Sequence, residues 1–330
     1  MTKIGVVGGG AWGTALAATA AQAGCDVTIW VLEDEVAESI NSDHENKLFL
    51  SGIKLDPAVR ATRDMADLAD CAFVLMVTPA QYLRPMAAEL APHLKGGTPL
   101  VVCSKGIEKG TGALMSEVLA EAAPECTVAI LSGPTFAAEV ARGMPAAVTI
   151  AAESEEAARY IAEAIGHPSF RPYWTDDIVG AQVGGAIKNI IAIASGIAAG
   201  KDMGENTKAL LITRGIAEMA RFATHKGARR DTLMGLSGLG DLVLTCGSIQ
   251  SRNMSLGKSI GEGRTLAEIM AERRTVAEGV HSAEIAHELA VKLGVDMPIV
   301  AAVYAVLHQG VDVNVAIGRL MDRPFTREQN

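Results

Sequence analysis

The sequence predicts a doubly wound α/β domain followed by an all-helical domain. A β-branched strand, a glycine-rich turn and an Ala-rich helix open the chain. Short apolar runs then alternate with helical stretches through the first half, which is typical of a parallel sheet with helices on both faces. From about Ile178 onward the β signal disappears and helical spacing remains.

The opening segment has the pattern of a dinucleotide-binding turn. The strand Lys3–Val7 is followed by Gly8-x-Gly10-x-x-Gly13 and by a helical stretch over 14–23. Gly8 is expected to make the tight turn, Gly10 to admit a pyrophosphate, and Gly13 to let the helix pack close to the strand. The N-terminal N–H groups of that helix would face the phosphates. Glycine-rich turns also serve plain packing, so the position between strand and helix is what favours a cofactor site.

The strands of the first half are continuously apolar, which fits burial on both faces of a sheet. Helices such as Leu83–Ala91 and Leu114–Ala122 lie between them. The predicted strands are Lys3–Val7, Val27–Val31, Ala72–Val77, Pro99–Cys103, Thr127–Ile130, Ala147–Ala151 and Phe170–Tyr173.

The second half is predicted to be helical throughout. We place the boundary near Asp177, which gives a nucleotide-binding domain over 1–177 and a substrate domain over 178–330. The predicted helices are Gly180–Ala199, Thr207–Thr224, Ser251–Gly261, Leu266–Arg274, Ser282–Leu293 and Ile299–His308.

Composition narrows the function classes. The 330 residues suffice for two cores, and the net charge of −9 argues against non-specific binding to nucleic acid or anionic membranes. The longest apolar stretch, Ala186–Gly200, includes Lys188 and Asn189 and is too short to span a bilayer. Because the first strand begins within a few residues of Met1, we expect no signal peptide, no membrane insertion and a cytoplasmic protein.

Cysteine and histidine spacing predicts neither a disulfide framework nor a metal site. The five cysteines are scattered without a C-x-x-C pair, and three beside strands are expected to be buried thiols: Cys25, Cys71 and Cys103. One group was considered for a metal: His281, Glu284, His287 and Glu288. Since His287 is rotated away from the helical face of the others, a charged helix surface is favoured.

Two lysines are candidates for chemistry. Lys105, in Cys103-Ser104-Lys105-Gly106-Ile107-Glu108, follows a buried strand, so it projects from the carboxyl edge of the sheet where open α/β folds bind ligands. The alternative is a solvated loop lysine. Lys188 lies in an apolar, glycine-rich helix, where burial would lower its pKa toward the acid/base range. The alternative is a lysine that snorkels from a helix end.

A third segment offers a carboxylate and phosphate-binding groups. Asp241 and Thr245 lie one helical turn apart, and Ser251-Arg252-Asn253 precedes a helical stretch. A guanidinium beside free backbone donors suits a phosphate. The alternative is an N-cap serine beside a surface arginine.

Together these segments resemble the bacterial NAD(P)-dependent sn-glycerol-3-phosphate dehydrogenases, nearly end to end. The resemblance implies a Rossmann-type domain followed by a helical one. The matching motifs are Gly8-Gly9-Gly10-Ala11-Trp12-Gly13-Thr14-Ala15-Leu16, Lys105-Gly106-Ile107-Glu108, Ser132-Gly133-Pro134-Thr135-Phe136-Ala137-Ala138-Glu139-Val140, Gly185-Ala186-Ile187-Lys188-Asn189, Gly204-Glu205-Asn206-Thr207, Gly238-Leu239-Gly240-Asp241, Ser251-Arg252-Asn253 and Val276-Ala277-Glu278-Gly279.

The resemblance implies hydride transfer from NADH or NADPH to dihydroxyacetone phosphate, giving sn-glycerol 3-phosphate for phospholipid synthesis. It implies that Lys188 is the proton donor and acceptor, aided by Asp241 and Lys105. The implied substrate contacts are Lys105, Gly133, Thr135, Lys188, Asp241, Ser251, Arg252 and Asn253. The implied cofactor contacts are Gly8, Gly10, Ala11, Trp12, Gly13, Lys105, Ala137, Arg252, Val276 and Glu278.

One departure bears on the choice between NADH and NADPH. Many relatives have a basic residue after the tryptophan that matches Trp30, whereas in this chain no Lys or Arg occurs between Trp30 and Lys47. Glu33 lies where an acid bonds the ribose 2′-OH and repels a 2′-phosphate, which favours NADH. The alternative is that Glu33 is a favourable acid at a helix start.

Two other functions were weighed. A β-hydroxyacid or 6-phosphogluconate dehydrogenase shares the two-domain plan and a helix lysine, but lacks the segments around Lys105 and Arg252. A non-catalytic dinucleotide sensor would need no proton donor such as Lys188. Apolar C-terminal helices are compatible with a homodimer, and equally with the core of a monomer.

Overall fold

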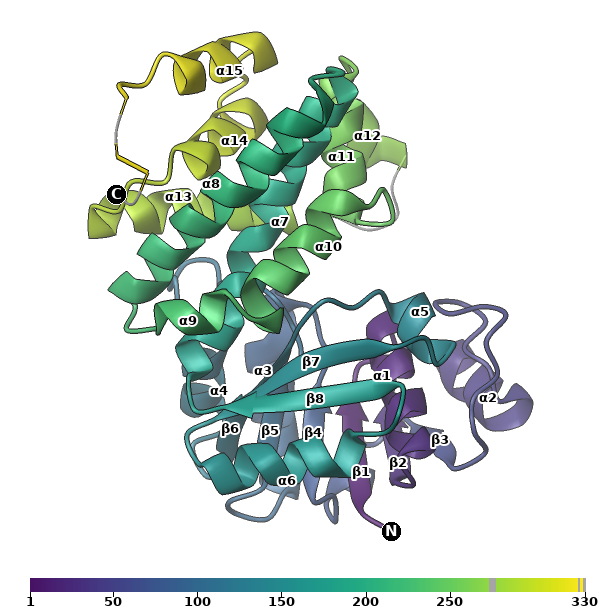
Figure 1. Cartoon of the computed structure of the whole chain (residues 1–330). Helices are drawn as coiled ribbons and strands as arrows, with labels where there is room; N and C mark the ends of the chain where they lie inside the picture. The colour runs from purple at the N-terminus through teal and green to yellow at the C-terminus, as the bar shows by residue number, and fades with distance from the viewer. Residues whose placement is uncertain (273–276, 326, 329–330) are drawn as a thin grey trace. The chain divides into compact units, whose positions relative to one another are not determined.

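The computed structural model describes residues 1–272, 277–325 and 327–328. It divides into two compact units (Figure 1): unit 1 is Met1–Gly185 with Ala228–Asp241, and unit 2 is Ala186–Gly227 with Leu242–Asn330. Unit 1 contains a sheet and helices, and the regular elements in the described part of unit 2 are all helices. The predicted fold class is therefore confirmed, while the domain boundary near Asp177 stays a prediction.

Unit 1 is built on an eight-stranded sheet in the order β3-β2-β1-β4-β5-β6-β7-β8. Neighbouring strands are parallel except β6 and β7, which corrects the prediction of a purely parallel sheet. The connection between them holds only the five-residue α5 (Ala137–Ala141), too short to return along a six-residue strand. The strands are β1 (Lys3–Val7), β2 (Asp26–Trp30), β3 (Val59–Thr62), β4 (Phe73–Met76), β5 (Pro99–Val102), β6 (Thr127–Ser132), β7 (Ala146–Ala152) and β8 (Phe170–Thr175).

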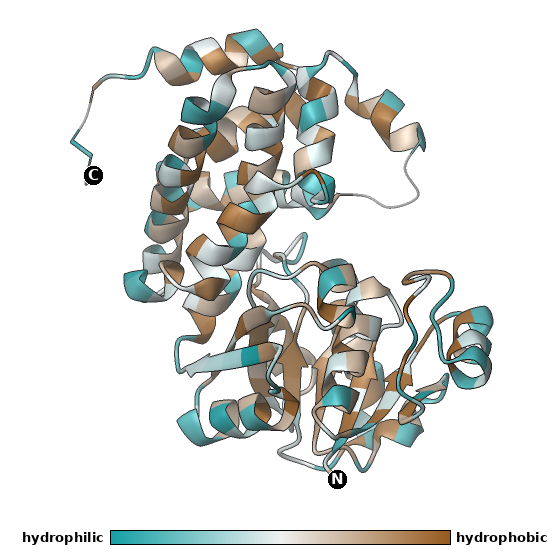
Figure 2. Cartoon of the chain, turned by 45° about the vertical axis from the view of Figure 1, so that its right-hand side comes forward, coloured by the Kyte–Doolittle hydropathy of each residue, from teal (hydrophilic) through white to brown (hydrophobic). Residues whose placement is uncertain are grey.

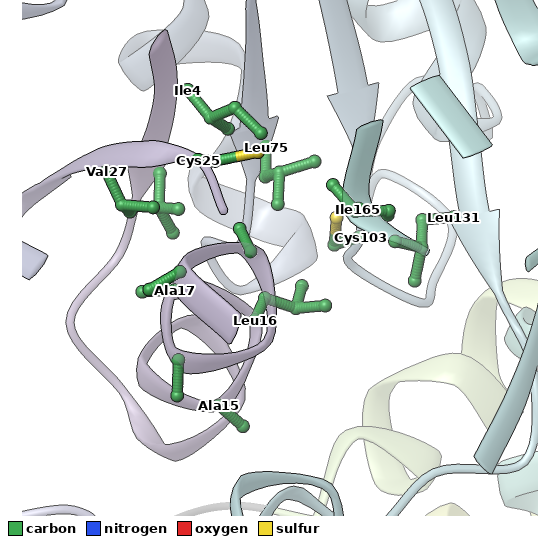
Figure 3. Packing of buried hydrophobic residues seen from close by; sticks show 14 of the residues in the cluster. Ile4, Ala15, Leu16, Ala17, Cys25, Val27, Leu75, Cys103, Leu131 and Ile165 are labelled. Carbon is green, nitrogen blue, oxygen red and sulfur yellow. The ribbon is translucent and has the colours of Figure 1, made fainter. Parts of the chain in front are cut away.

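Burial on both faces explains the apolar strands. Along β4, Phe73 and Leu75 enter one core while Val74 and Met76 enter the other. Figure 3 shows side chains of the first core, where Cys25 and Cys103 lie among aliphatic groups. The three cysteines beside strands are buried free thiols, as predicted.

The edge strand β3 has no apolar run, and the sequence analysis did not predict it. Val59 is its buried residue, whereas Arg60 is exposed. In Figure 2 the central strands of the sheet are coloured as hydrophobic. An edge strand contacts a neighbour on one side only, so it needs less apolar surface.

The helices of unit 1 are α1 (Ala11–Gln22), α2 (Asp34–Asp43), α3 (Leu83–Leu90), α4 (Met115–Ala122), α5, α6 (Glu155–Ile165) and α9 (Arg230–Leu233), with short helical turns η1 (Met65–Leu68), η2 (Ala80–Tyr82), η3 (Ala91–His93) and η4 (Leu236–Gly240). Most of these helices connect strands of the sheet, whereas α9 and η4 follow the last strand and lie, in chain order, between α8 (Gly204–His225) and α10 (Asp241–Gly247).

Unit 2 is a helical bundle; α7 crosses from unit 1 into unit 2 after Gly185, and α10 begins at Asp241, the last residue of unit 1. α9, α10 and α15 were not predicted. The predicted helix over 266–274 extends past Glu272 onto residues 273 and 274, which lie outside the described residues. The helices are α7 (Ile178–Gly200), α8 (Gly204–His225), α10 (Asp241–Gly247), α11 (Arg252–Gly261), α12 (Leu266–Glu272), α13 (Glu278–Leu293), α14 (Pro298–His308) and α15 (Val313–Met321).

Glycines bring α7 and α11 into backbone contact. An added Cβ at Gly257 would lie 2.0 Å from the carbonyl oxygen of Ile193, and one at Gly196 would lie 2.1 Å from that of Met254. Such distances leave no room for any side chain. By length and composition α7 could cross a membrane, but 83% of its most apolar window is buried inside the protein.

Candidate active site

The turn after β1 forms a cradle that requires glycine. Gly8 has a φ of +123°, and a Cβ there would lie 2.7 Å from the carbonyl oxygen of Val77. A Cβ at Gly13 would lie 1.9 Å from the carbonyl oxygen of Gly8, so α1 packs directly on the turn as predicted. Gly10 differs, because it is exposed and open space surrounds the place of its Cβ.

The start of α1 is suited to an anion. Gly10 is its N-cap, and no side-chain capping bond is formed there among the described residues. Ala11 and Trp12 lie in that turn, half-buried, and Ala137 begins α5, which packs against α1. An open backbone, uncapped N–H groups and the positive end of the helix dipole fit the pyrophosphate of a dinucleotide.

A buried asparagine, which the sequence analysis missed, braces this turn. Asn46 is fully buried, and its Nδ2 donates to the carbonyl oxygen of Gly9 at 2.7 Å and to Oγ1 of Thr14 at 2.8 Å. Its Oδ1 accepts from the N–H of Phe49 at 3.0 Å. Asn46 lies 37 residues from Gly9 in sequence, so no local pattern indicates this role.

Three buried hydroxyls at the carboxyl edge of the sheet have no hydrogen-bond partner within the part of the chain that the structure describes. Thr78 follows β4, Ser104 follows β5, and Ser132 ends β6. Buried polar atoms are nearly always hydrogen-bonded. Open α/β sheets bind their ligands at this edge. These hydroxyls therefore fit a polar ligand such as the nicotinamide end of the dinucleotide.

Lys105 and Asp241 form a buried ion pair at the same edge. Lys105 Nζ lies 2.7 Å from Oδ2 of Asp241 and donates to the carbonyl oxygen of Gly133 at 3.1 Å. The Asp241 side chain is 0% exposed and that of Lys105 is 17% exposed. Thr135 Oγ1 also reaches the Gly133 carbonyl oxygen, at 3.4 Å. The structure thus brings together four residues predicted from three separate motifs.

Two residues from the η2–α3 segment hold the loop that includes Lys105. Gln81 donates to the carbonyl oxygen of Ile107 and accepts from the N–H of Lys109, both at 2.9 Å. Arg84 makes two 2.8 Å bonds to the carboxylate of Glu108 and holds the pKa of Glu108 below its usual range. These bonds restrain the loop on both sides of Glu108.

Glycines of the first turns of α7 make room for unit 1 groups. A Cβ at Gly185 would lie 3.1 Å from Cγ of Lys105, and one at Gly184 would lie 2.2 Å from the carbonyl oxygen of Ser237. The glycines just before Lys188 therefore make room for the Lys105 side chain and for the backbone at Ser237.

In unit 2, Lys188 is 6% exposed and its Nζ donates to Oγ1 of Thr245 at 2.8 Å. Gly279, at the start of α13, packs beside it: a Cβ there would lie 2.9 Å from the carbonyl oxygen of Asn189. The lysine is thus buried in the bundle, which excludes a snorkelling position at a helix end.

The Ser251-Arg252-Asn253 segment starts α11. Ser251 Oγ accepts from the N–H of Met254 at 3.2 Å, so it is an N-cap, while Arg252 is exposed. Asn253 is buried and its Oδ1 accepts from the N–H of Gly279 at 3.0 Å. The serine O–H and the asparagine amide N–H groups are the atoms that could donate to a phosphate. Two residues predicted to contact the cofactor lie just before Gly279 in the sequence. Glu278 is half-buried at the start of α13, and Val276 lies outside the described residues.

At the end of β2, Glu33 is half-buried and is the N-cap residue of α2. The stretch after Trp30 led to the inference that no cation lies near Glu33, and that inference is wrong. β3 pairs with β2, and Arg63, the residue after β3, forms an ion pair with Asp34. Strand pairing, rather than sequence distance, places the cation here.

Two family models match this chain. One describes the N-terminus of NAD-dependent glycerol-3-phosphate dehydrogenase and matches residues 3–158, and the other describes its C-terminus and matches residues 177–318. The chain belongs to this family. The family, the oxidoreductase class and the dependence on NAD(P) expected from the motifs are confirmed.

Relatives within the glycerol-3-phosphate dehydrogenase family match nearly the whole chain. The NAD(P)+ enzyme of Parvibaculum lavamentivorans is 53% identical over 99% of this chain and 98% of its own. That of Caulobacter vibrioides is 54% identical with the same coverage. The crystal structure of the Coxiella burnetii enzyme has a TM-score of 0.92 at 34% identity and covers 98% of this chain and 99% of its own.

Proposed function

We propose that this dehydrogenase reversibly reduces dihydroxyacetone phosphate to sn-glycerol 3-phosphate and so supplies glycerophospholipid synthesis. The observation that supports the chemistry is the buried Lys188, held by Thr245 inside an apolar helix. Burial of an ammonium group is unfavourable unless it is hydrogen-bonded or paired, so a lysine placed inside an apolar helix is a candidate for acid/base chemistry. When bound, the reduced nicotinamide supplies the hydride that reaches C2 of the ketone.

In this proposal Lys188 gives a proton to the C2 oxygen as hydride reaches the carbon, and takes it back in the reverse direction. The Thr245 hydroxyl, which accepts from Nζ at 2.8 Å, orients the ammonium group. Lys105 is held by Asp241 and by the Gly133 carbonyl, so it offers a fixed positive charge to the substrate oxygens. General acid catalysis of this kind contributes about 10²–10⁴-fold to rate.

The phosphate of the substrate is assigned to Ser251, Arg252 and Asn253. Arg252 supplies the charge, and the other two keep donor hydrogens that their capping bonds do not use. Thr135 and Gly133 complete the predicted substrate contacts. Phosphate binding remote from the reacting carbon can position a small ketone.

The cofactor is assigned to the glycine turn and the residues predicted with it. Gly10 would admit the pyrophosphate, Gly8 and Gly13 would shape the turn that holds it, and Ala11 and Trp12 would line it. The remaining assigned contacts are Lys105, Ala137, Arg252, Val276 and Glu278. Glu33 would accept a hydrogen bond from the ribose 2′-OH, which favours NADH over NADPH.

We also propose a cytoplasmic protein that binds neither nucleic acid nor membranes, and whose apolar C-terminal helices are compatible with a homodimer and equally with a monomer. The net charge of −9 supports the absence of polyanion binding. The test of the activity is the initial rate of loss of reduced-nicotinamide absorbance with dihydroxyacetone phosphate, measured in parallel with NADH and NADPH. Turnover supports the reaction, a large preference for NADPH contradicts the role of Glu33, and nucleotide binding without turnover contradicts the substrate.

A further inference from the structure

The end of β3 is fixed beside the end of β2. Thr62 pairs with Trp30 in the sheet, and the N–H of Val31 donates to the carbonyl oxygen of Thr62 at 2.9 Å. The indole Nε1 of Trp30 donates to the carbonyl oxygen of Arg63 at 3.0 Å. The main chain at Arg63 is therefore held where the β2 strand gives way to α2.

From that position the Arg63 guanidinium pairs with the carboxylate of Asp34, the first residue of α2. The pair is exposed, with 48% of the Arg63 side chain and 84% of the Asp34 side chain accessible to solvent. Exposed pairs of this kind are weak and exchange partners readily. The neighbouring Glu33 adds a second negative charge at this point of the chain.

We propose that Arg63 accommodates the 2′-phosphate of NADPH and that Asp34 competes with the nucleotide for it, an inference that rests on the proposed function. The ribose 2′ position of a bound dinucleotide lies at the end of the second strand, where an arginine is the usual partner of a 2′-phosphate. A guanidinium can form two parallel hydrogen bonds with a phosphate as well as with a carboxylate, and a phosphate dianion carries more negative charge than the single carboxylate of Asp34. One site then accepts both nucleotides.

In the NADH complex Arg63 stays on Asp34, and Glu33 faces the 2′-OH. In the NADPH complex Arg63 leaves Asp34 and binds the 2′-phosphate. Glu33 repels the 2′-phosphate. NADH is therefore favoured, but NADPH is not excluded. Asp34 and Glu33 together set the ratio of the two affinities.

The test is equilibrium binding of NADH, NADPH, 5′-ADP and 2′,5′-ADP to the full chain, by calorimetry at constant ionic strength and without substrate. The variants are Arg63→Ala, Asp34→Asn and a matched control, Arg60→Ala. Arg60 lies on β3, the strand that precedes Arg63, but toward the amino end of that strand. It pairs with Asp26 of β2 at 2.8 Å. Thermal unfolding of each variant checks that the fold is intact.

Arg63→Ala is expected to weaken binding of NADPH and of 2′,5′-ADP by about 5–30-fold, and to change binding of NADH and 5′-ADP less than about twofold. Asp34→Asn should strengthen NADPH binding by about 2–5-fold, and Arg60→Ala should leave all four ligands within about twofold. Equal weakening of NADH and NADPH by Arg63→Ala, or no change in either, would overturn the assignment. Failure of the wild-type chain to bind any of the four would instead contradict the proposed function.

Discussion

Gly257 in unit 2 and Gly10 in unit 1 have opposite surroundings. In unit 2, a Cβ at Gly257 would lie 2.0 Å from a carbonyl oxygen of α7, so glycine there lets two helices touch. In unit 1, Gly13 is similarly closed, whereas Gly10 has nothing within 4 Å of an added Cβ. We propose that Gly10, at a helix start, serves a ligand, because no neighbouring atom requires glycine there. The closed glycine Gly257 is needed for the packing of two helices.

Substitution of a closed glycine should have the largest effect on stability. Gly257→Ala forces α7 and α11 apart and should lower the free energy of unfolding by roughly 2–4 kcal/mol, measured by urea denaturation. The control is Gly318→Ala in α15, where no atom lies within 4 Å of the added Cβ. There alanine should stabilise by up to about 1 kcal/mol. Similar losses for both variants would contradict the comparison.

The closed packing of unit 2 also buries an acid. Glu218 is 1% exposed and accepts from the N–H groups of Ile299 and Val300, and burial raises its pKa to about 7. The folded chain therefore binds a proton that the unfolded chain has released. The contribution of Glu218 to the free energy of unfolding is complete below its ordinary pKa near 4.5 and is lost as pH rises through about 7.

Between these values the free energy of unfolding should fall by an amount on the order of 2–3 kcal/mol. Denaturation across this pH range should show that slope in the wild type and a flatter one in Glu218→Gln. An unchanged slope in the variant would show that Glu218 stays ionised in the folded protein.

The open glycine should affect binding more than stability. Gly10 has an extended backbone, so Gly10→Ala should change the free energy of unfolding by less than about 1 kcal/mol. Its methyl group would occupy space assigned to the pyrophosphate, and NADH binding should weaken about tenfold or more. Gly13→Ala should instead lose stability, because its Cβ would lie 1.9 Å from a carbonyl oxygen. Unaltered NADH binding by Gly10→Ala would remove the functional explanation of the open glycine.

The smallest expected effects concern hydroxyls. Ser132 has a buried Oγ without a partner among the described residues, so Ser132→Ala should leave stability within about 0.5 kcal/mol and lower kcat/KM about 3–10-fold. Ser116 accepts from Gln182 Nε2 at 2.7 Å. Ser116→Ala should therefore lose about 1 kcal/mol of stability and keep its kcat/KM. If Ser132→Ala instead lost stability and kept its kcat/KM, Ser132 would be a packing residue.

Sequence patterns predicted those features that depend on local spacing. The strand, turn and helix around Gly8 were predictable because the glycine pattern lies directly between an apolar strand and an Ala-rich helix. Lys188 was predictable because it is a charge in an otherwise apolar helix. Asn46, Gln81 and Arg63 were not, since their partners are distant in sequence and only strand and loop packing brings them together. The edge strand β3 was missed because one buried residue leaves no apolar pattern.

The proposed proton transfer is tested most directly by Lys188→Met, a substitution that removes the ammonium group and keeps most of the side-chain volume. The measurement is kcat/KM with dihydroxyacetone phosphate and NADH, beside NADH affinity. We expect kcat/KM to fall about 10²–10⁴-fold while NADH affinity stays within about threefold. A kcat/KM close to that of the wild type, with NADH binding intact, would contradict the assignment of Lys188 as the proton donor.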